Sequence, residues 1–184
     1  MESARRSPSN RTRRAESEAR RGFRLSLLTT LLMLACGGPA GPSVPNVQGF
    51  YRGGWSVSSC TDTGVFASLS ACDWELGGGH LFTLRVTQSD RSLQGFINVC
   101  ESQIEDATGT VETDGTVLLS GQAKGNNLYP PMALSDFRAA VRGTAMTGSF
   151  VCTVYASGSV PGTISMTGTL KDVTLLSPDP NLSY

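Results

Sequence analysis

The sequence predicts an all-β protein, a single antiparallel barrel of eight up-and-down strands. Segments of 7 to 11 residues alternate apolar and polar side chains, with Gly, Asp and Asn between them. We find no convincing helical period in this region. Eight short strands in succession favour an up-and-down barrel. A two-sheet β-sandwich is the alternative, because periodicity alone does not separate the two architectures.

Glycines placed within or at the start of the expected strands favour the barrel over the sandwich. They follow a Gln, Thr or Ser in five pairs: Gln94-Gly95, Thr108-Gly109, Ser120-Gly121, Thr147-Gly148 and Thr167-Gly168. Glycine weakens a strand unless the backbone must bend or approach another backbone closely. A small closed barrel needs such bends to curl its sheet shut.

Each expected strand has one apolar face, and tight connections join most of them. The sixth strand is expected at 133–142. The inward side chains of the other seven are expected to be Tyr51, Trp55 and Val57; Phe82, Leu84 and Val86; Leu93, Ile97 and Val99; Val111; Val117 and Leu119; Met146, Phe150, Cys152 and Val154; and Ile164, Met166 and Leu170. Turns are expected at 89–91, 113–115 and 143–145. Two longer segments, 61–79 and 124–131, interrupt this rhythm.

The barrel domain is expected over residues 47–176, a length that suits one domain with its own core. A flexible, Pro- and Gly-rich tether precedes it at 36–46. After it, residues 177–184 are expected to form a disordered tail, beginning Ser177-Pro178-Asp179-Pro180.

Residues 1–35 have the pattern of a secretory signal peptide with a long, Arg-rich n-region. Arg20, Arg21 and Arg24 precede the mostly apolar run Leu25 to Ala35, which is too short to span a bilayer. The segment from Arg20 to Leu25 is similar to a twin-arginine export signal. General secretion and twin-arginine export both stay open.

Met33-Leu34-Ala35-Cys36, followed by Gly37, resembles the bacterial lipobox. The resemblance implies that the Cys36 thiol is diacylated before cleavage, which anchors the protein to a membrane of the cell envelope. Gly37 after the cysteine resembles outer-membrane sorting, with the domain facing the periplasm or the cell surface. The alternative is an ordinary signal peptide whose removal leaves Cys36 unmodified.

Charge and cysteine count limit the partners. After cleavage the chain carries 7 basic and 12 acidic residues, which argues against nucleic acid as a partner. With Cys36 lipidated, four cysteines remain, Cys60, Cys72, Cys100 and Cys152, and this even number predicts two disulfides in an exported domain. Three pairings are open, and we favour Cys60 with Cys72 and Cys100 with Cys152. The alternative interpretation is that these cysteines bind zinc. The chain has no Cys-x-x-Cys pair, however, and it has only one histidine.

Gly53-Gly54-Trp55 on the first expected strand resembles the Gly-x-Trp motif of the calycins, the superfamily of lipocalins and avidins. The resemblance implies a barrel that holds a small apolar ligand, with Lys171 packing across Trp55. Tyr51, Trp55, Phe82 and Phe150 are the candidate cavity residues, although aromatic side chains on a core face also serve simply as core.

Catalytic and metal motifs are weak. Asp62-Thr63-Gly64 spells the aspartic-protease triplet, but it has no second copy, and a tight turn explains it better. His80, beside Asp73 and Glu75 in sequence, lacks a nucleophile elbow and is expected to be solvated.

Other patterns also point away from a cofactor. Glu101, Glu105 and Asp106 are expected on an exposed loop without EF-hand spacing. Gly77-Gly78-Gly79 lacks the Lys-Ser/Thr of a phosphate-binding loop. We therefore expect no enzymatic activity, no metal and no cofactor.

The leading functional hypothesis is a lipid-anchored binding module for a small apolar ligand. The alternative is a protein-interaction or inhibitor module that binds through its loops, where Phe66 and Trp74 lie in a segment tied by the Cys60–Cys72 bridge. A structural envelope lipoprotein is the third hypothesis.

Overall fold

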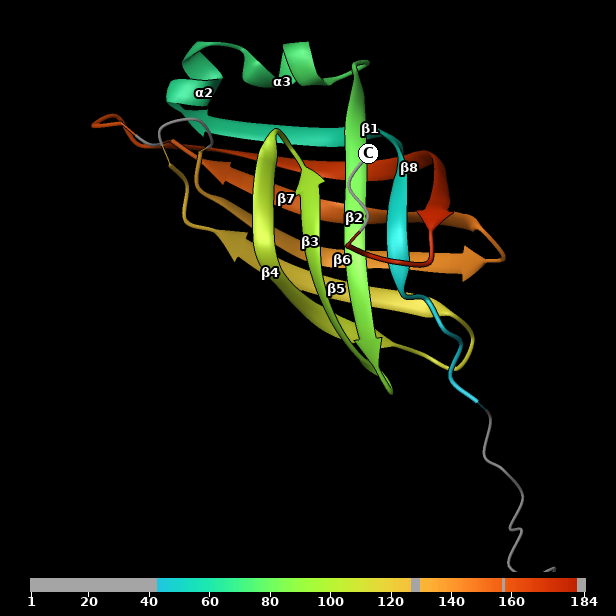
Figure 1. Ribbon diagram of the computed structural model, residues 1–184. Helices are drawn as coiled ribbons and strands as arrows, with labels where there is room; N and C mark the ends of the chain where they lie inside the picture. Colours follow the sequence, from blue (N-terminus) through green and yellow to red (C-terminus); the bar gives the residue numbers. More distant parts are fainter. Residues whose placement is uncertain (1–42, 127–129, 157, 182–184) are drawn as a thin grey trace, which may run out of the picture. The chain divides into compact units, whose positions relative to one another are not determined.

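The computed structural model describes residues 43–126, 130–156 and 158–181, and its eight antiparallel strands close into one barrel (Figure 1). Each strand pairs with its neighbours in the chain, and the first strand closes on the last. The elements are β1 (Gly49–Gly64), α2 (Val65–Ser68), α3 (Ala71–Glu75), β2 (Gly79–Ser89), β3 (Ser92–Val99), β4 (Ser102–Val111), β5 (Thr116–Ala123), β6 (Met132–Arg142), β7 (Ala145–Tyr155) and β8 (Gly162–Ser177). The predicted fold class is confirmed, and the sandwich is excluded because the sheet has no break.

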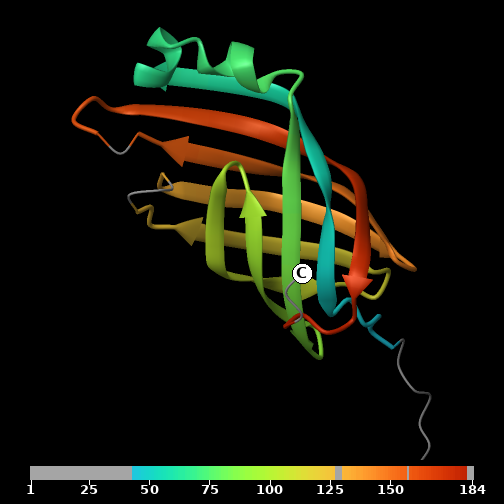
Figure 2. The same cartoon turned by 45° about the horizontal axis from the view of Figure 1, so that its top comes forward.

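The longest strands, β1 and β8, pair along nearly their whole length, from Phe50 opposite Ser177 to Gly64 opposite Gly162. On its other edge, β1 pairs with β2 only as far as Ser56, opposite Gly79. The second half of β1 therefore runs past the end of β2, and the two short helices pack there (Figure 2). We call this end of the barrel, with α2 and α3, the helix end.

The barrel interior is the hydrophobic core, and the inward faces follow the predicted alternation. On β1, for example, Tyr51, Trp55 and Val57 are buried while Arg52 is exposed. The same period-two pattern holds through β8, where Ile164, Met166 and Leu170 are buried. Burial of one face of every strand fixes the register, since a shift by one residue would expose the whole apolar set.

The barrel interior requires glycine at position 168. A Cβ atom built at Gly168 would collide with the ring of Phe150, its register partner on β7. The absence of a side chain on β8 therefore makes room for a large aromatic side chain on β7. The pairing between β7 and β8 also shifts register between Met146 and Ser149, as expected for a sharply bent sheet.

The longer segment at 61–79 contains the end of β1 and the helices α2 and α3. One local expectation was wrong. The triplet Asp62-Thr63-Gly64 does not form a tight turn but belongs to β1 and pairs with β8. The carboxylate Oδ2 of Asp62 accepts a hydrogen bond from the backbone N–H of Cys72 at 3.1 Å, so Asp62 fixes the start of α3 on the strand.

Residues 45–47 are held at the end of the barrel opposite the helices. The Gln88 side chain bonds both the N–H of Val47 (2.8 Å) and the carbonyl of Pro45 (3.0 Å). Val47 is buried, and its carbonyl accepts a hydrogen bond from the Tyr51 hydroxyl at 2.9 Å. Burial raises the pKa of Tyr51 to about 12. The chain thus reaches the barrel beside the β2–β3 turn.

The described residues bear only in part on the predicted boundaries. The signal peptide, Cys36 and most of the tether lie outside them. At the other end, β8 continues to Ser177, and Pro180 beyond it is buried, with Asp179 and Asn181 hydrogen-bonded in local turns. Among the described residues, no helix has the length and apolar character needed to cross a membrane.

Candidate ligand pocket

The four candidate cavity residues lie in the barrel core, where three of them belong to one aromatic cluster. Phe137 joins the cluster and stacks on Phe82 and Phe150, with ring centroids 6.1 and 6.3 Å apart. The edge of Phe150 meets Trp55 at 5.2 Å. Tyr51 is equally buried and bonds Val47. Offset and edge-on contacts of this kind stabilise a packed core. That these four residues line a ligand cavity stays a prediction.

His80 and Glu75 connect this aromatic cluster to the helix end of the barrel. His80 on β2 stacks on Trp55, with centroids 4.3 Å apart and planes inclined by 22°. The Nε2 atom of His80 lies 3.3 Å from Oε2 of Glu75 on α3, within ion-pair range but not aligned for a hydrogen bond. The His80 side chain is only 17% exposed, so the expectation of a solvated histidine was wrong.

The residue that covers Trp55 also differs from the one that the calycin resemblance implies. Lys171 is exposed and lies opposite Gly54, because the alternation of β8 turns its side chain outward. Leu170 is the residue opposite Trp55 on β8, and His80 supplies the stacked ring from β2. Among the described residues, neither Trp55 Nε1 nor His80 Nε2 has a hydrogen-bond partner.

A pocket of about 300 Å³ opens at the helix end, and we call it the mouth pocket. Its walls come from the two helices, the β3–β4 turn, the end of β7 and the start of β8. Its lining residues are Phe66, Ala71, Glu75, Cys100, Glu101, Pro130, Val154, Tyr155, Ala156, Ile164 and Met166. Most of this lining is apolar, with two carboxylates among it. Ligand sites commonly combine apolar walls with a few polar groups in this way.

Both disulfides brace the mouth pocket, and both predicted bridges are present. Cys60 of β1 is joined to Cys72 of α3, with Cα atoms 5.6 Å apart, which fastens the helices to the barrel. Cys100 in the β3–β4 turn is joined to Cys152 of β7, with Cα atoms 6.8 Å apart. Disulfides of this kind are typical of proteins that fold outside the cytoplasm.

The β3–β4 turn has an unusual backbone. Val99 pairs with Ser102, so the turn is the two-residue segment Cys100-Glu101, and both residues have positive φ angles of 53° and 54°. Two-residue turns with two positive φ angles normally use Asn-Gly or other small residues. Side chains larger than glycine make this conformation costly, and such strain occurs often at binding sites.

The charge of Glu75 is shaped by its position in the pocket wall. Burial raises its pKa above the ordinary value of 4.5; the neighbouring His80 lowers it, and Glu101 raises it further. The protonated form of Glu75 is therefore favoured in the folded protein relative to the unfolded chain. The main cause of the raised pKa is the partial burial of the Glu75 carboxyl group in the pocket wall.

Glu75 should make stability depend on pH in a defined direction. Because its folded-state pKa is raised, its contribution is fully present below 4.5 and is lost as the pH rises through the raised value. We expect the stability of the wild type relative to Glu75→Gln to fall across this window. Urea unfolding of both proteins at pH values on either side of 4.5 measures the difference. A difference that stays constant with pH would contradict the assignment.

A second hollow, of about 340 Å³, lies where β4 and β5 diverge, since these strands pair only between 108–111 and 117–120. Its lining is polar and includes Glu105, Asp106 and Lys124, so it suits an apolar ligand poorly. Glu105 and Asp106 lie on β4 and not on the expected loop. Among the described residues, no group of three His, Cys, Asp or Glu side chains is placed to hold a metal ion.

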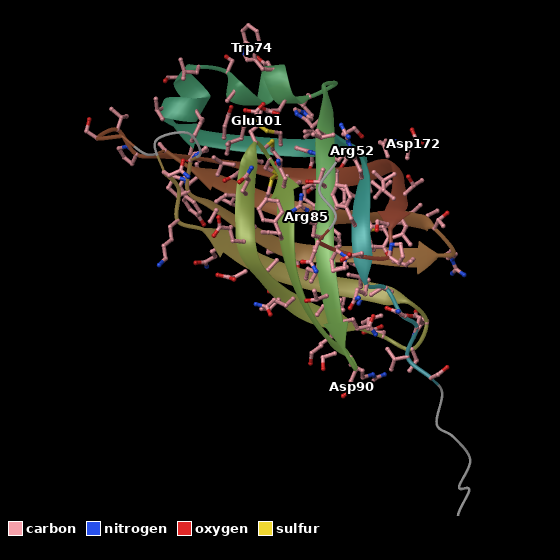
Figure 3. All side chains as sticks on the ribbon, viewed as in Figure 1. Arg52, Trp74, Arg85, Asp90, Glu101 and Asp172 are labelled. Atoms are coloured by element: carbon pink, nitrogen blue, oxygen red, sulfur yellow. A yellow bond between two sulfur atoms is a disulfide. The ribbon has the colours of Figure 1, made fainter. Side chains whose placement is uncertain are left out.

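The outer side of the helices presents exposed apolar side chains. Trp74 is 82% exposed, and Leu69 and Leu76 on the same segment are also exposed. Figure 3 places Trp74 and Asp90 at opposite ends of the barrel. The prediction that Phe66 and Trp74 share a stapled segment is therefore refined: Phe66 faces the mouth pocket and Trp74 faces away from the core.

Sequence reasoning found the apolar wall of the pocket but not the two carboxylates that line it. Val154, Ile164 and Met166 were assigned to the core face, and they do face inward. Glu101 was expected on an exposed charged loop, and Glu75 was considered only as an acid near His80 in the sequence. The one available signal was the position of Glu101 next to a disulfide cysteine, between two clear strand patterns.

The fold and pocket define a class of protein: an extracytoplasmic, disulfide-braced, up-and-down β-barrel with a pocket at one end. This architecture is consistent with a calycin-like fold. Comparisons with protein families, with curated proteins and with solved structures find no match to this chain. The functional argument therefore depends on the pocket itself.

Proposed function

We propose that this protein is a non-enzymatic binding module that holds a small apolar ligand in the mouth pocket. The observation that carries the proposal is the apolar lining of that pocket, to which Phe66, Val154, Ile164 and Met166 contribute. A volume of about 300 Å³ is at the lower end of the range of small-molecule sites. A ligand there would rest above the aromatic core rather than replace part of it.

The proposal includes a lipid anchor on Cys36, in the bacterial outer membrane, as the lipobox resemblance implies. The path of the described chain suits this arrangement, because residues 45–47 are bound beside Gln88 at the end opposite the helices. The described chain therefore enters the barrel at the end opposite the mouth pocket.

Binding of the neutral fluorescent probe N-phenyl-1-naphthylamine tests the proposal. We expect one saturable site in the wild type. Ala71→Phe adds a ring to the pocket wall and should weaken binding at least tenfold by filling the space that the probe needs. The matched control is Ala67→Phe, which adds the same ring to an exposed position on the neighbouring helix and should leave binding unchanged.

Absence of saturable binding to the wild type, or equal weakening in both variants, would contradict the proposal.

A second candidate function, docking on another envelope protein, is favoured by one observation: the exposed side chains of Leu69, Trp74 and Leu76. Tryptophan is among the residue types that are enriched at the hot spots of protein interfaces. Trp74→Ser would abolish such docking while leaving probe binding intact.

A further inference from the structure

Two carboxylates share the mouth pocket, although they come from segments far apart in the chain. Glu75 ends α3. Glu101, labelled in Figure 3, is the second residue of the β3–β4 turn. Both line the same pocket as Phe66, Ile164 and Met166. Each carboxylate is therefore placed beside an apolar wall.

Neither carboxylate is balanced by a cationic Lys or Arg side chain in the described part of the chain. His80 lies beside Glu75 but not beside Glu101. Two like charges facing one shielded hollow repel each other. Opposite charge brought by a ligand would relieve this repulsion and form charge-assisted hydrogen bonds.

The position of Glu101 is held by the fold. Its left-handed backbone, with φ of 54°, is retained beside Cys100, whose side chain is bound to Cys152 on β7. Glycine or asparagine at position 101 would adopt this backbone conformation at lower cost than glutamate. The conformation thus places a carboxylate at the pocket at the expense of local stability.

Resting on the proposed function, we propose that the mouth pocket selects amphiphiles with an apolar tail and a cationic amine head. The tail lies along the apolar residues of α2, β7 and β8. The ammonium group lies between the carboxylates of Glu75 and Glu101 and donates hydrogen bonds to both.

Three ligands with the same tail test the proposal: octylamine, octanol and octanoate, measured by isothermal titration calorimetry. We expect octylamine to bind about tenfold more tightly than octanol, as two partly exposed carboxylate–ammonium contacts allow. Octanoate should bind most weakly because the carboxylates repel it. Equal affinities for the amine and the alcohol would overturn this inference while leaving the proposed function standing. Failure of all three to bind would overturn both.

Charge-removing variants locate the head group. Glu101→Gln should reduce the affinity for octylamine about fivefold and leave that for octanol unchanged, and Glu75→Gln should act in the same direction. The matched control is Glu112→Gln, which removes a carboxylate from the β4–β5 connection outside the pocket. Equal effects of Glu101→Gln and Glu112→Gln would show that overall charge, not the pocket, selects the amine, and would refute the proposal.

Discussion

Replacing both Cys100 and Cys152 by alanine is expected to lower the free energy of unfolding by about 4 kcal/mol. The bridge closes a loop with a sequence separation of 52, so its removal releases a large amount of conformational freedom in the unfolded chain. Equilibrium unfolding in urea, followed by the fluorescence of buried Trp55, measures the loss. The variant should also relax the left-handed turn at Glu101 and weaken ligand binding.

The second disulfide provides an internal control. Its sequence separation is only 12, so Cys60→Ala with Cys72→Ala should cost about 3 kcal/mol, less than the other pair. Both variants should show a larger m-value than the wild type, because an unfolded chain without the cross-link exposes more surface, and the increase should be greater for the longer loop. A larger cost for the shorter loop would show that native packing, and not loop closure, determines the contribution of these bridges.

The fold could be predicted from the sequence because one physical rule operates along the whole barrel. Residues such as Phe82, Leu84 and Val86 alternate with polar ones, and alternation directly encodes which face is buried. Glycines such as Gly168 mark where the sheet must bend or make room. The pairing of β1 with β8, which closes the barrel, is recorded in the sequence only through these glycines, because alternation alone is also compatible with a sandwich.

The pocket could not be predicted in this way because it depends on contacts between distant segments. Glu75 and Glu101 line the same pocket because two disulfides and closure of the barrel bring their segments together. No local sequence pattern indicates that these two segments are neighbours. His80 was expected in solvent because a Gly-rich segment precedes it, but its register partner on β1 is Trp55, which provides a ring to stack upon. Lys171 was misplaced because it follows the inward-facing Leu170 on β8, so the alternation of the strand turns its side chain outward.

Replacing Phe150 by alanine is expected to cost about 4 kcal/mol, because it removes a fully buried ring and leaves a cavity. The ring meets Trp55 and Phe137 and covers Gly168, so the lost contacts come from three strands. The matched control is Phe96→Ala on the outer face, where the ring is half-buried beside Arg85. That change should cost no more than about 1 kcal/mol. Urea unfolding of both variants makes the comparison, and equal losses would contradict the placement of Phe150 in the core.

Coupling between Phe150 and Gly168 gives a sharper test of the same packing. Gly168→Ala alone should destabilise the barrel, because the added methyl group collides with the Phe150 ring. In the Phe150→Ala background the ring is gone, and the methyl group partly fills the cavity. The double-mutant cycle should therefore show a favourable coupling of about 1 kcal/mol or more. Additive costs would mean that the two strands do not touch at this point, and the barrel would then have to close differently from the arrangement described.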